Sequence, residues 1–369
     1  MNPGLYIHIP FCEQRCYYCA FTVAVGPEHT FEPYVRRLVR ELELSGFGDV
    51  AETIYLGGGT PSLISADLLG RILRASPANT ATEISIEVNP GTLSSDKVAQ
   101  YRDLGINRVS LGAQSLEDED LHRAGRLHKA SAVYADFHLL RQNGFSNINL
   151  DLIAGLPSQE LETWTRNLDK ALELRPEHIS IYMLDHEERS AWAKLPPGIP
   201  EENDFADFYA EAESRLGTAG YLHYEISNWA LPGRECRHNV GYWTGVPYRG
   251  CGVGAHSYDG VRRFWNTTSL AEYAHLIDDG RLPTLGEELL TPPLRHEEAF
   301  MLGLRQACGV NVCAVAKALG IVYSPEWRLR VEQLQDAGWI HFDGTILRLT
   351  AKGRLAANSV IEELIWPTP

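Results

Sequence analysis

Three cysteines near the start of the chain are spaced closely enough to share one metal centre. Cys12, Cys16 and Cys19 have the spacing C-x3-C-x2-C and are three of the seven cysteines in the 369-residue sequence. Three thiolates on one loop can hold three irons of a [4Fe–4S] cubane, which needs four ligands. Because no fourth cysteine lies nearby, the spacing predicts a cluster whose fourth iron is open to a ligand from outside the chain.

Zinc is the alternative metal for this group of thiols. A structural zinc site takes four protein ligands in a closed tetrahedron, and His8 or His29 could supply the fourth. Bulky residues interleaved with the cysteines are expected to form an apolar shell that limits solvent access: Phe11, Tyr17, Tyr18 and Phe21.

The elements that must position this loop alternate between short apolar runs and amphipathic helical stretches. The runs are rich in β-branched and aliphatic residues, as buried parallel strands are: Leu5–Ile9, Thr53–Leu56, Glu83–Val88, Arg108–Leu111, Ile148–Ile153 and His178–Leu184. Helices are expected over Tyr34–Leu42, from Ser115, and over Ala130–Gln142 before Asn143-Gly144. Six strand–helix repeats indicate an α/β fold with a parallel barrel or an open sheet.

Polar or glycine residues end almost every apolar run, which favours a partial barrel. In parallel α/β folds, ligands bind at the carboxyl ends of the strands. Each residue alone could simply end a strand and begin a loop. Together they should surround one face of the predicted barrel: Gly57–Pro61, Glu87–Pro90, Gly112–Ser115 and Asp151. The predicted fold is therefore a partial parallel (β/α) barrel of about six strands.

The length and the composition favour one large unit followed by a smaller one. We expect the partial barrel with the cysteine loop over 1–220, an aromatic, Gly- and His-rich region closing the barrel over 221–290, and a winged-helix-like domain over 291–369. An acidic, Pro-containing connection with a helix from Phe205 precedes residue 221. The last domain should contain these elements: helices Glu297–Gln306, Val312–Ala318, Pro325–Asp336 and Ala356–Leu364, and a hairpin Trp339–Leu349.

The charges exclude some classes of partner. The formal charge of −15 disfavours broad contact with nucleic acid or an anionic membrane, since phosphates must be neutralised by Lys and Arg. The winged-helix-like region carries eight Lys and Arg against eight Asp and Glu, so partner docking is favoured over DNA binding. Its Cys308 and Cys313 are expected to be buried as small hydrophobic residues.

Targeting and membrane segments are not expected. The chain has no signal-peptide pattern and no apolar run near the ~18 residues of a membrane helix. A cytoplasmic location follows, where clustered cysteines bind metal more often than they form disulfides.

These motifs resemble the radical S-adenosylmethionine (SAM) family. The cysteine loop after an N-terminal strand and Gly57-Gly58-Gly59-Thr60-Pro61 after the second strand are similar to the two hallmarks of that family. More narrowly, the chain resembles the branch that contains oxygen-independent coproporphyrinogen III oxidases and HemW-type heme chaperones. The likeness spans nearly the whole chain, through Ile-Glu-Val-Asn-Pro, Gly-Ala-Gln-Ser, Asp-Leu-Ile-Ala-Gly-Leu-Pro and the C-terminal module.

The resemblance implies roles for particular residues. SAM would chelate the open iron through its amino and carboxylate groups, and bare glycine backbone would let it approach closely. The residues that match SAM-binding positions are Tyr6, Gly58, Gly59, Thr60, Glu87, Gln114, Arg126 and Asp151. They offer an anion for the amine, a cation for the carboxylate and acceptors for ribose hydroxyls. Glu87 or Asp151 alone could instead cap a following helix.

Three features favour the chaperones over the oxidases within this branch. Only eleven residues precede Cys12, whereas the oxidase has a longer leading segment, and Phe21 stands where the oxidase has a fourth cysteine. The third feature is the motif H-N-x-x-Y-W, formed by His238, Asn239, Tyr242 and Trp243.

This motif resembles a heme-binding signature, with His238 as the tentative iron ligand. Cys236 and His256 are rival ligands, and a histidine that is merely hydrogen-bonded in an aromatic loop is the non-functional alternative.

The resemblance implies a heme chaperone that binds a [4Fe–4S] cluster, SAM and one heme, and transfers heme to an acceptor hemoprotein. An electron donor would be a second partner. Whether the chain is also an enzyme stays open. The alternatives are an oxygen-independent coproporphyrinogen III oxidase and a related radical SAM methyltransferase or cyclopropanase.

Overall fold

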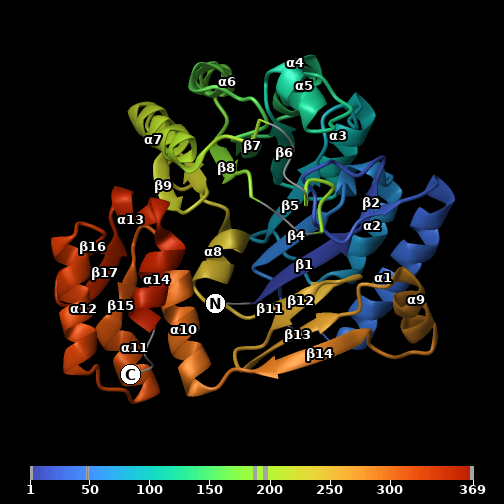
Figure 1. Ribbon diagram of the computed structural model, residues 1–369. Helices are drawn as coiled ribbons and strands as arrows, with labels where there is room; N and C mark the ends of the chain where they lie inside the picture. Colours follow the sequence, from blue (N-terminus) through green and yellow to red (C-terminus); the bar gives the residue numbers. More distant parts are fainter. Residues whose placement is uncertain (1–2, 47, 49, 186–188, 194–197, 366–369) are drawn as a thin grey trace.

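A twelve-stranded mixed sheet forms the centre of the computed structural model, which describes residues 3–46, 48, 50–185, 189–193 and 198–365 (Figure 1). All six predicted strands are neighbours in it: β1 (Gly4–Ile9), β4 (Thr53–Gly58), β5 (Glu83–Val88), β6 (Arg108–Gln114), β7 (Ile148–Ala154) and β8 (His178–Met183). Together with β11 (Tyr248–Cys251), they make seven consecutive parallel strands. The described sheet has two free edges, β14 and β9, so the predicted α/β partial barrel is confirmed.

The segment from 221 to 290 contributes strands to both edges of this sheet. β9 (Leu222–Glu225) and β10 (Asn228–Ala230) extend it antiparallel beyond β8. β12 (His256–Tyr258), β13 (Arg262–Asn266) and β14 (Thr284–Leu289) extend it antiparallel beyond β11, beside β1 in Figure 1. These strands are short and carry many exposed residues, so no apolar run marks them in the sequence.

Helices cover one face of the parallel strands. Leu5, Ile7 and Ile9 of β1 are fully buried in the core on that side, whereas Tyr6 and His8 point to the opposite, concave face because side chains alternate along a strand. The helices of this part are α1 (Phe31–Ser45), α2 (Ala66–Ala75), α3 (Ser95–Asp103), α4 (Asp118–Arg123), α5 (Ala130–Gln142), α6 (Leu161–Glu173), α7 (Glu202–Thr218), α8 (Arg237–Trp243) and α9 (Leu270–Asp278), with short 3-10 turns at Glu28–Thr30 and Pro61–Leu63.

A smaller unit with its own core follows at the C-terminal end, drawn in orange and red in Figure 1. It contains α10 (Pro292–Gly303), α11 (Val312–Leu319), α12 (Pro325–Asp336), α13 (Ala351–Leu355) and α14 (Ala357–Ile365), with the three-stranded sheet of β15 (Val310–Asn311), β17 (Ile346–Leu349) and β16 (Ile340–Phe342). α10 begins five residues earlier than predicted, because proline is well tolerated in the first turn of a helix.

The prediction that Cys308 and Cys313 are buried is wrong, since both are exposed. Cys308 lies in the turn after α10, and Cys313 follows Val312, which is buried at the start of α11. Successive helical residues are about 100° apart around the axis, so Val312 faces the core while Cys313 does not.

Within the described ranges, no helix has both the length and the apolar character needed to cross a bilayer.

Candidate cluster and cofactor site

The cysteine loop and the carboxyl ends of the parallel strands enclose one cavity of about 370 Å³. Its lining includes all three cysteines of the loop and seven of the eight residues predicted to bind SAM: Gly58, Gly59, Thr60, Glu87, Gln114, Arg126 and Asp151. The eighth, Tyr6, is not in the lining. It lies one strand away and stacks on Tyr55, which does line the cavity (centroids 6.3 Å apart).

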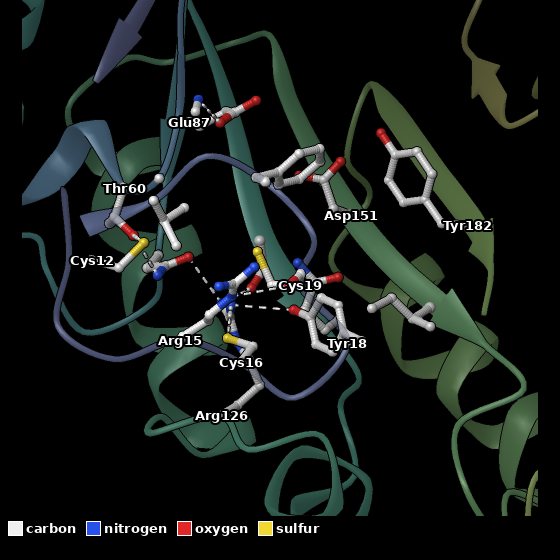
Figure 2. A pocket seen from close by; sticks show the side chains of 18 of the residues that line it. Cys12, Arg15, Cys16, Tyr18, Cys19, Thr60, Glu87, Arg126, Asp151 and Tyr182 are labelled. Atoms are coloured by element: carbon white, nitrogen blue, oxygen red, sulfur yellow. Dashed lines mark hydrogen bonds between the residues drawn. The ribbon is translucent and has the colours of Figure 1, made fainter. Parts of the chain in front are cut away.

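Two of the three thiols of the loop accept hydrogen bonds from residues of the barrel. Thr60 Oγ1 donates to Cys12 Sγ (3.6 Å), and Arg126 Nη1 donates to Cys16 Sγ (3.4 Å). The amide of Cys19 donates to the carbonyl of Cys16 (3.2 Å). Figure 2 shows the three sulfurs grouped around the Arg126 guanidinium, with Glu87 and Asp151 farther along the cavity.

Burial affects the protonation of these thiols. It raises the pKa of Cys12 to about 11 and also raises the pKa of Cys19. Since iron binds thiolates, loading of a cluster must release protons from the loop.

The donor set fits a multi-iron cluster better than a single zinc ion. His8 has both ring nitrogens engaged, Nδ1 with the Tyr6 hydroxyl (3.0 Å) and Nε2 with the Thr22 carbonyl (2.8 Å). His29 lies in a separate surface hollow beside Lys97. Among the residues that the structure describes, no three His, Cys, Asp or Glu side chains are grouped to hold one metal ion. Three thiols without a fourth protein ligand would leave one iron of a cubane open, whereas a structural zinc site needs four protein ligands.

The glycine motif docks directly on the backbone of the cysteine loop. The amide of Gly59 donates to the Ile9 carbonyl and that of Thr60 to the Phe11 carbonyl (2.8 Å each). A Cβ on Gly59 would lie 2.6 Å from the Pro10 oxygen and 2.7 Å from the Phe11 oxygen. Only glycine allows this close approach.

Two carboxylates lie in the cavity with unusual protonation. Burial and the nearby Asp151 raise the pKa of Glu87 to about 7, although Glu87 accepts a hydrogen bond from the Gly58 amide (2.9 Å). Burial also raises the pKa of Asp151, which accepts from Ser110 Oγ and Asn149 Nδ2 (2.8 Å each). Burial and a like charge shift acids in this direction, and such shifts are typical of functional sites.

Arg126 and Gln114 complete the polar wall. Arg126 Nη2 donates to Asn89 Oδ1 (2.9 Å) and to the Gly112 carbonyl (2.8 Å). Gln114 ends β6 with φ of +64° at a shift in register. A left-handed backbone is uncommon for a residue other than glycine and occurs often at binding sites.

Some residues of the cavity were not assigned to SAM binding from the sequence. Asn89 donates to Thr60 Oγ1 (2.9 Å) and so joins Arg126 to the glycine motif. The sequence placed Asn89 in the ring of residues at the strand ends, without a role of its own. Tyr18 and Tyr182 also line the cavity.

The predicted apolar shell around the cysteines is only half present. Phe11 is 3 % exposed, but Tyr17 is 46 % and Phe21 70 % exposed.

The H-N-x-x-Y-W motif lies at the other end of the strands. It forms α8, whose His238 contacts Thr53 and Gly4, the first residues of β4 and β1. A second cavity of about 350 Å³ opens here, lined by His238 and Tyr242 but not by Asn239 or Trp243. The carbonyl of Trp243 accepts from Gln306 Nε2 of the C-terminal unit (2.9 Å).

His238 is hydrogen-bonded through both ring nitrogens and stacked on one face. Its Nδ1 bonds with the Thr53 hydroxyl (2.7 Å), its Nε2 bonds with the Tyr242 hydroxyl (2.8 Å), and its ring stacks on Tyr55 (5.2 Å). Burial, with Arg108 nearby, lowers the pKa of His238 to about 3, so the ring is neutral. The rival ligand Cys236 is fully buried. The cysteine cavity and the motif are therefore separate, with Tyr55 between them.

Comparisons with known proteins identify the family of the chain. Residues 6–171 match the model of the radical SAM superfamily, and residues 290–356 match that of the HemN C-terminal domain. The heme chaperone HemW of Bacillus subtilis is 34 % identical over 370 residues, covering 96 % of this chain and 97 % of that protein. The heme chaperone HemW of Escherichia coli is 39 % identical over 308 residues, covering 81 % and 76 %.

A solved structure has the same fold over almost the whole chain. The coproporphyrinogen III oxidase HemN of Escherichia coli, a radical SAM enzyme, superposes with a TM-score of 0.87 at 25 % identity and covers 99 % of this chain and 90 % of its own. Fold and sequence together place the protein in one branch of a large superfamily. The chain belongs to the HemW-type heme chaperones of the radical SAM superfamily.

Proposed function

We propose that this chain is a heme chaperone that holds a [4Fe–4S] cluster on Cys12, Cys16 and Cys19, binds SAM beside it, carries one heme and passes that heme to an acceptor hemoprotein. The observation that carries the proposal is the single cavity in which three thiols, a glycine motif, one arginine and two carboxylates meet. The relatives of the chain are named heme chaperones. The exposed Cys308 and Cys313 would stay reduced in the cytoplasm, where we expect the chain to act.

Different residues of the cavity would bind different groups of SAM. Glu87, beside the Gly58 amide, would accept from the methionyl amine, and Arg126 would pair with the methionyl carboxylate. Gln114 and Asp151 would accept from the ribose hydroxyls. A cluster reduced by one electron from a donor protein would supply the electron for reductive cleavage of SAM.

Heme is proposed to bind at the H-N-x-x-Y-W segment. His238 can present Nε2 to an iron once the Tyr242 hydroxyl moves aside, while Thr53 keeps its bond to Nδ1. A hydrogen bond on the second nitrogen is the usual way in which an imidazole ligand is oriented.

The function is tested by offering hemin and coproporphyrinogen III in parallel to the anaerobically reconstituted chain with SAM. We expect capture of about one heme per chain and no decarboxylation. Turnover of coproporphyrinogen III would instead make the chain an oxidase, and methylated or cyclopropanated product would place it with the methyltransferases.

SAM affinity should depend on the protonation of Glu87. Its pKa of about 7 in the ligand-free protein means that the carboxylate needed for the methionyl amine forms only as the pH rises through neutrality. Among the described residues, the other titratable groups that interact with it are Asp151, Tyr6, Tyr55, Tyr182 and Tyr242. Isothermal titration should therefore show tighter SAM binding at pH 8 than at pH 6, by about tenfold over the whole interval.

The variant Glu87→Gln separates this effect from others. The folded pKa lies above the unfolded value of 4.5, so ionisation of Glu87 costs stability as the pH rises through that window. Without SAM, Glu87→Gln should be more stable than the parent at pH 8, by roughly 1–3 kcal/mol, and it should lose the pH dependence of SAM binding. An unchanged pH profile in this variant would remove Glu87 from the amine site.

A further inference from the structure

We propose that His256 is an iron ligand for the heme cargo, on an aromatic shelf formed by His256, Tyr258 and Trp265. The inference rests on the proposed function and names His256, outside the H-N-x-x-Y-W motif, as the iron ligand in place of His238. The sequence named His256 only as a rival ligand, and the strands that form the shelf, β12 and β13, were not predicted.

The aromatic shelf is a continuation of the concave face of the barrel. Tyr6 of β1 lies level with Gly250 of β11, and Tyr248 of β11 pairs with Tyr258 of β12. His256 in turn pairs with Trp265 of β13. Paired residues of neighbouring strands share a face, so the shelf lies on the same side of the sheet as Tyr6 and the cavity wall.

His256 has a free ring, unlike the other described histidines of this face. His8, His178 and His238 each have both ring nitrogens hydrogen-bonded. In the part of the chain that the structure describes, neither nitrogen of His256 has a hydrogen-bond partner, and its side chain is exposed. Axial ligation of heme iron needs a lone pair that is not already shared, which His256 offers without rearrangement.

The ring of His256 is also neutral at physiological pH. Partial burial and the charge of Arg263 lower its pKa. A neutral imidazole is the form that binds a metal.

The shelf offers aromatic rings and a cation to a porphyrin. Trp265 stacks against His256 (5.8 Å) and its ring lies directly over Gly286, where a Cβ would come within 2.7 Å. Glycine on β14 therefore leaves space for the Trp265 ring. Arg263 lies over the Tyr258 ring (4.9 Å) and pairs with Glu298 of α10 (2.5 Å). A heme propionate could compete with Glu298 for this guanidinium.

The shelf adjoins the cysteine loop. A Cβ on Gly254, two residues before His256, would lie 3.0 Å from Thr22 Oγ1, and one on Gly252 would lie 2.6 Å from the His8 carbonyl. Heme held at His256 would thus lie beside the loop that carries the cluster cysteines.

Hemin titration of the full chain tests this assignment. His256→Ala should weaken hemin binding by about tenfold or more and shift the Soret band, and added imidazole should restore the parental spectrum. His275→Ala is the matched control, since it removes another exposed histidine, on α9. Thermal unfolding and iron content should match the parent in both variants.

The outcomes separate this inference from the proposed function. Loss of the axial signature in His256→Ala, alone or together with His238→Ala, supports the assignment. Parental affinity and spectrum in His256→Ala, with loss only in His238→Ala, overturns it and leaves the heme chaperone intact. A parent chain that captures no hemin overturns the proposed function itself.

Discussion

Replacing Cys16 by alanine should leave the chain without an iron–sulfur cluster. Two thiolates cannot hold a cubane that already lacks a fourth protein ligand, and Cys16 is the thiol bonded to Arg126 (3.4 Å). After anaerobic reconstitution, iron and sulfide analysis should give about four irons per parent chain and almost none in Cys16→Ala. The visible charge-transfer absorbance of the cluster should disappear with the iron.

The matched control is Cys308→Ala, which removes an exposed cysteine in the C-terminal unit. It should retain the full iron content. One tightly bound zinc without iron in the parent chain, or full iron in Cys16→Ala, would contradict the assignment of the loop.

The second large effect is expected from Gly59→Ala. The added methyl would lie within 2.7 Å of two backbone carbonyl oxygens, those of Pro10 and Phe11. Backbone oxygens cannot rotate away as a flexible side chain can, so the glycine motif must separate from the cysteine loop. We expect a loss of about 1–3 kcal/mol in the free energy of unfolding and SAM binding weakened by at least about tenfold.

Gly217→Ala controls for the change of glycine to alanine. Gly217 lies within α7, and a Cβ there would meet no atom within 4 Å. This variant should be more stable by about 0.5–1 kcal/mol, because alanine favours a helix over glycine, with parental SAM binding. If Gly59→Ala behaved like Gly217→Ala, the close contact between the glycine motif and the cysteine loop would not matter for SAM binding.

The parallel strands and the cysteine cavity could be predicted because each corresponds to a local pattern in the sequence. Buried parallel strands are short apolar runs, and polar residues at their ends gather at one edge by the geometry of the fold. Thus Glu87, Gln114 and Asp151 come from three different strands and line the same cavity. The helix boundaries follow from similar local signals, such as the end of α5 at Asn143-Gly144.

The remaining features depend on tertiary packing, which the sequence pattern does not record. The H-N-x-x-Y-W motif left open whether His238 is hydrogen-bonded, because its partner at Nδ1, Thr53, lies 185 residues away in sequence. Strands β12 to β14 pair with one another and with β11 but bury few of their side chains. Their aromatic shelf is visible only once the register places His256 beside Trp265.

Heme transfer tests the central claim most directly. The reconstituted chain would be loaded with one equivalent of hemin, and unbound hemin would be removed. The loaded chain would then be mixed with an apo-hemoprotein, the two proteins separated, and the Soret band of each recorded over time. We predict that heme leaves this chain and appears on the acceptor faster than free hemin is released into buffer. Heme that stays on the chain, or that reaches the acceptor only at the rate of release into buffer, would contradict the account.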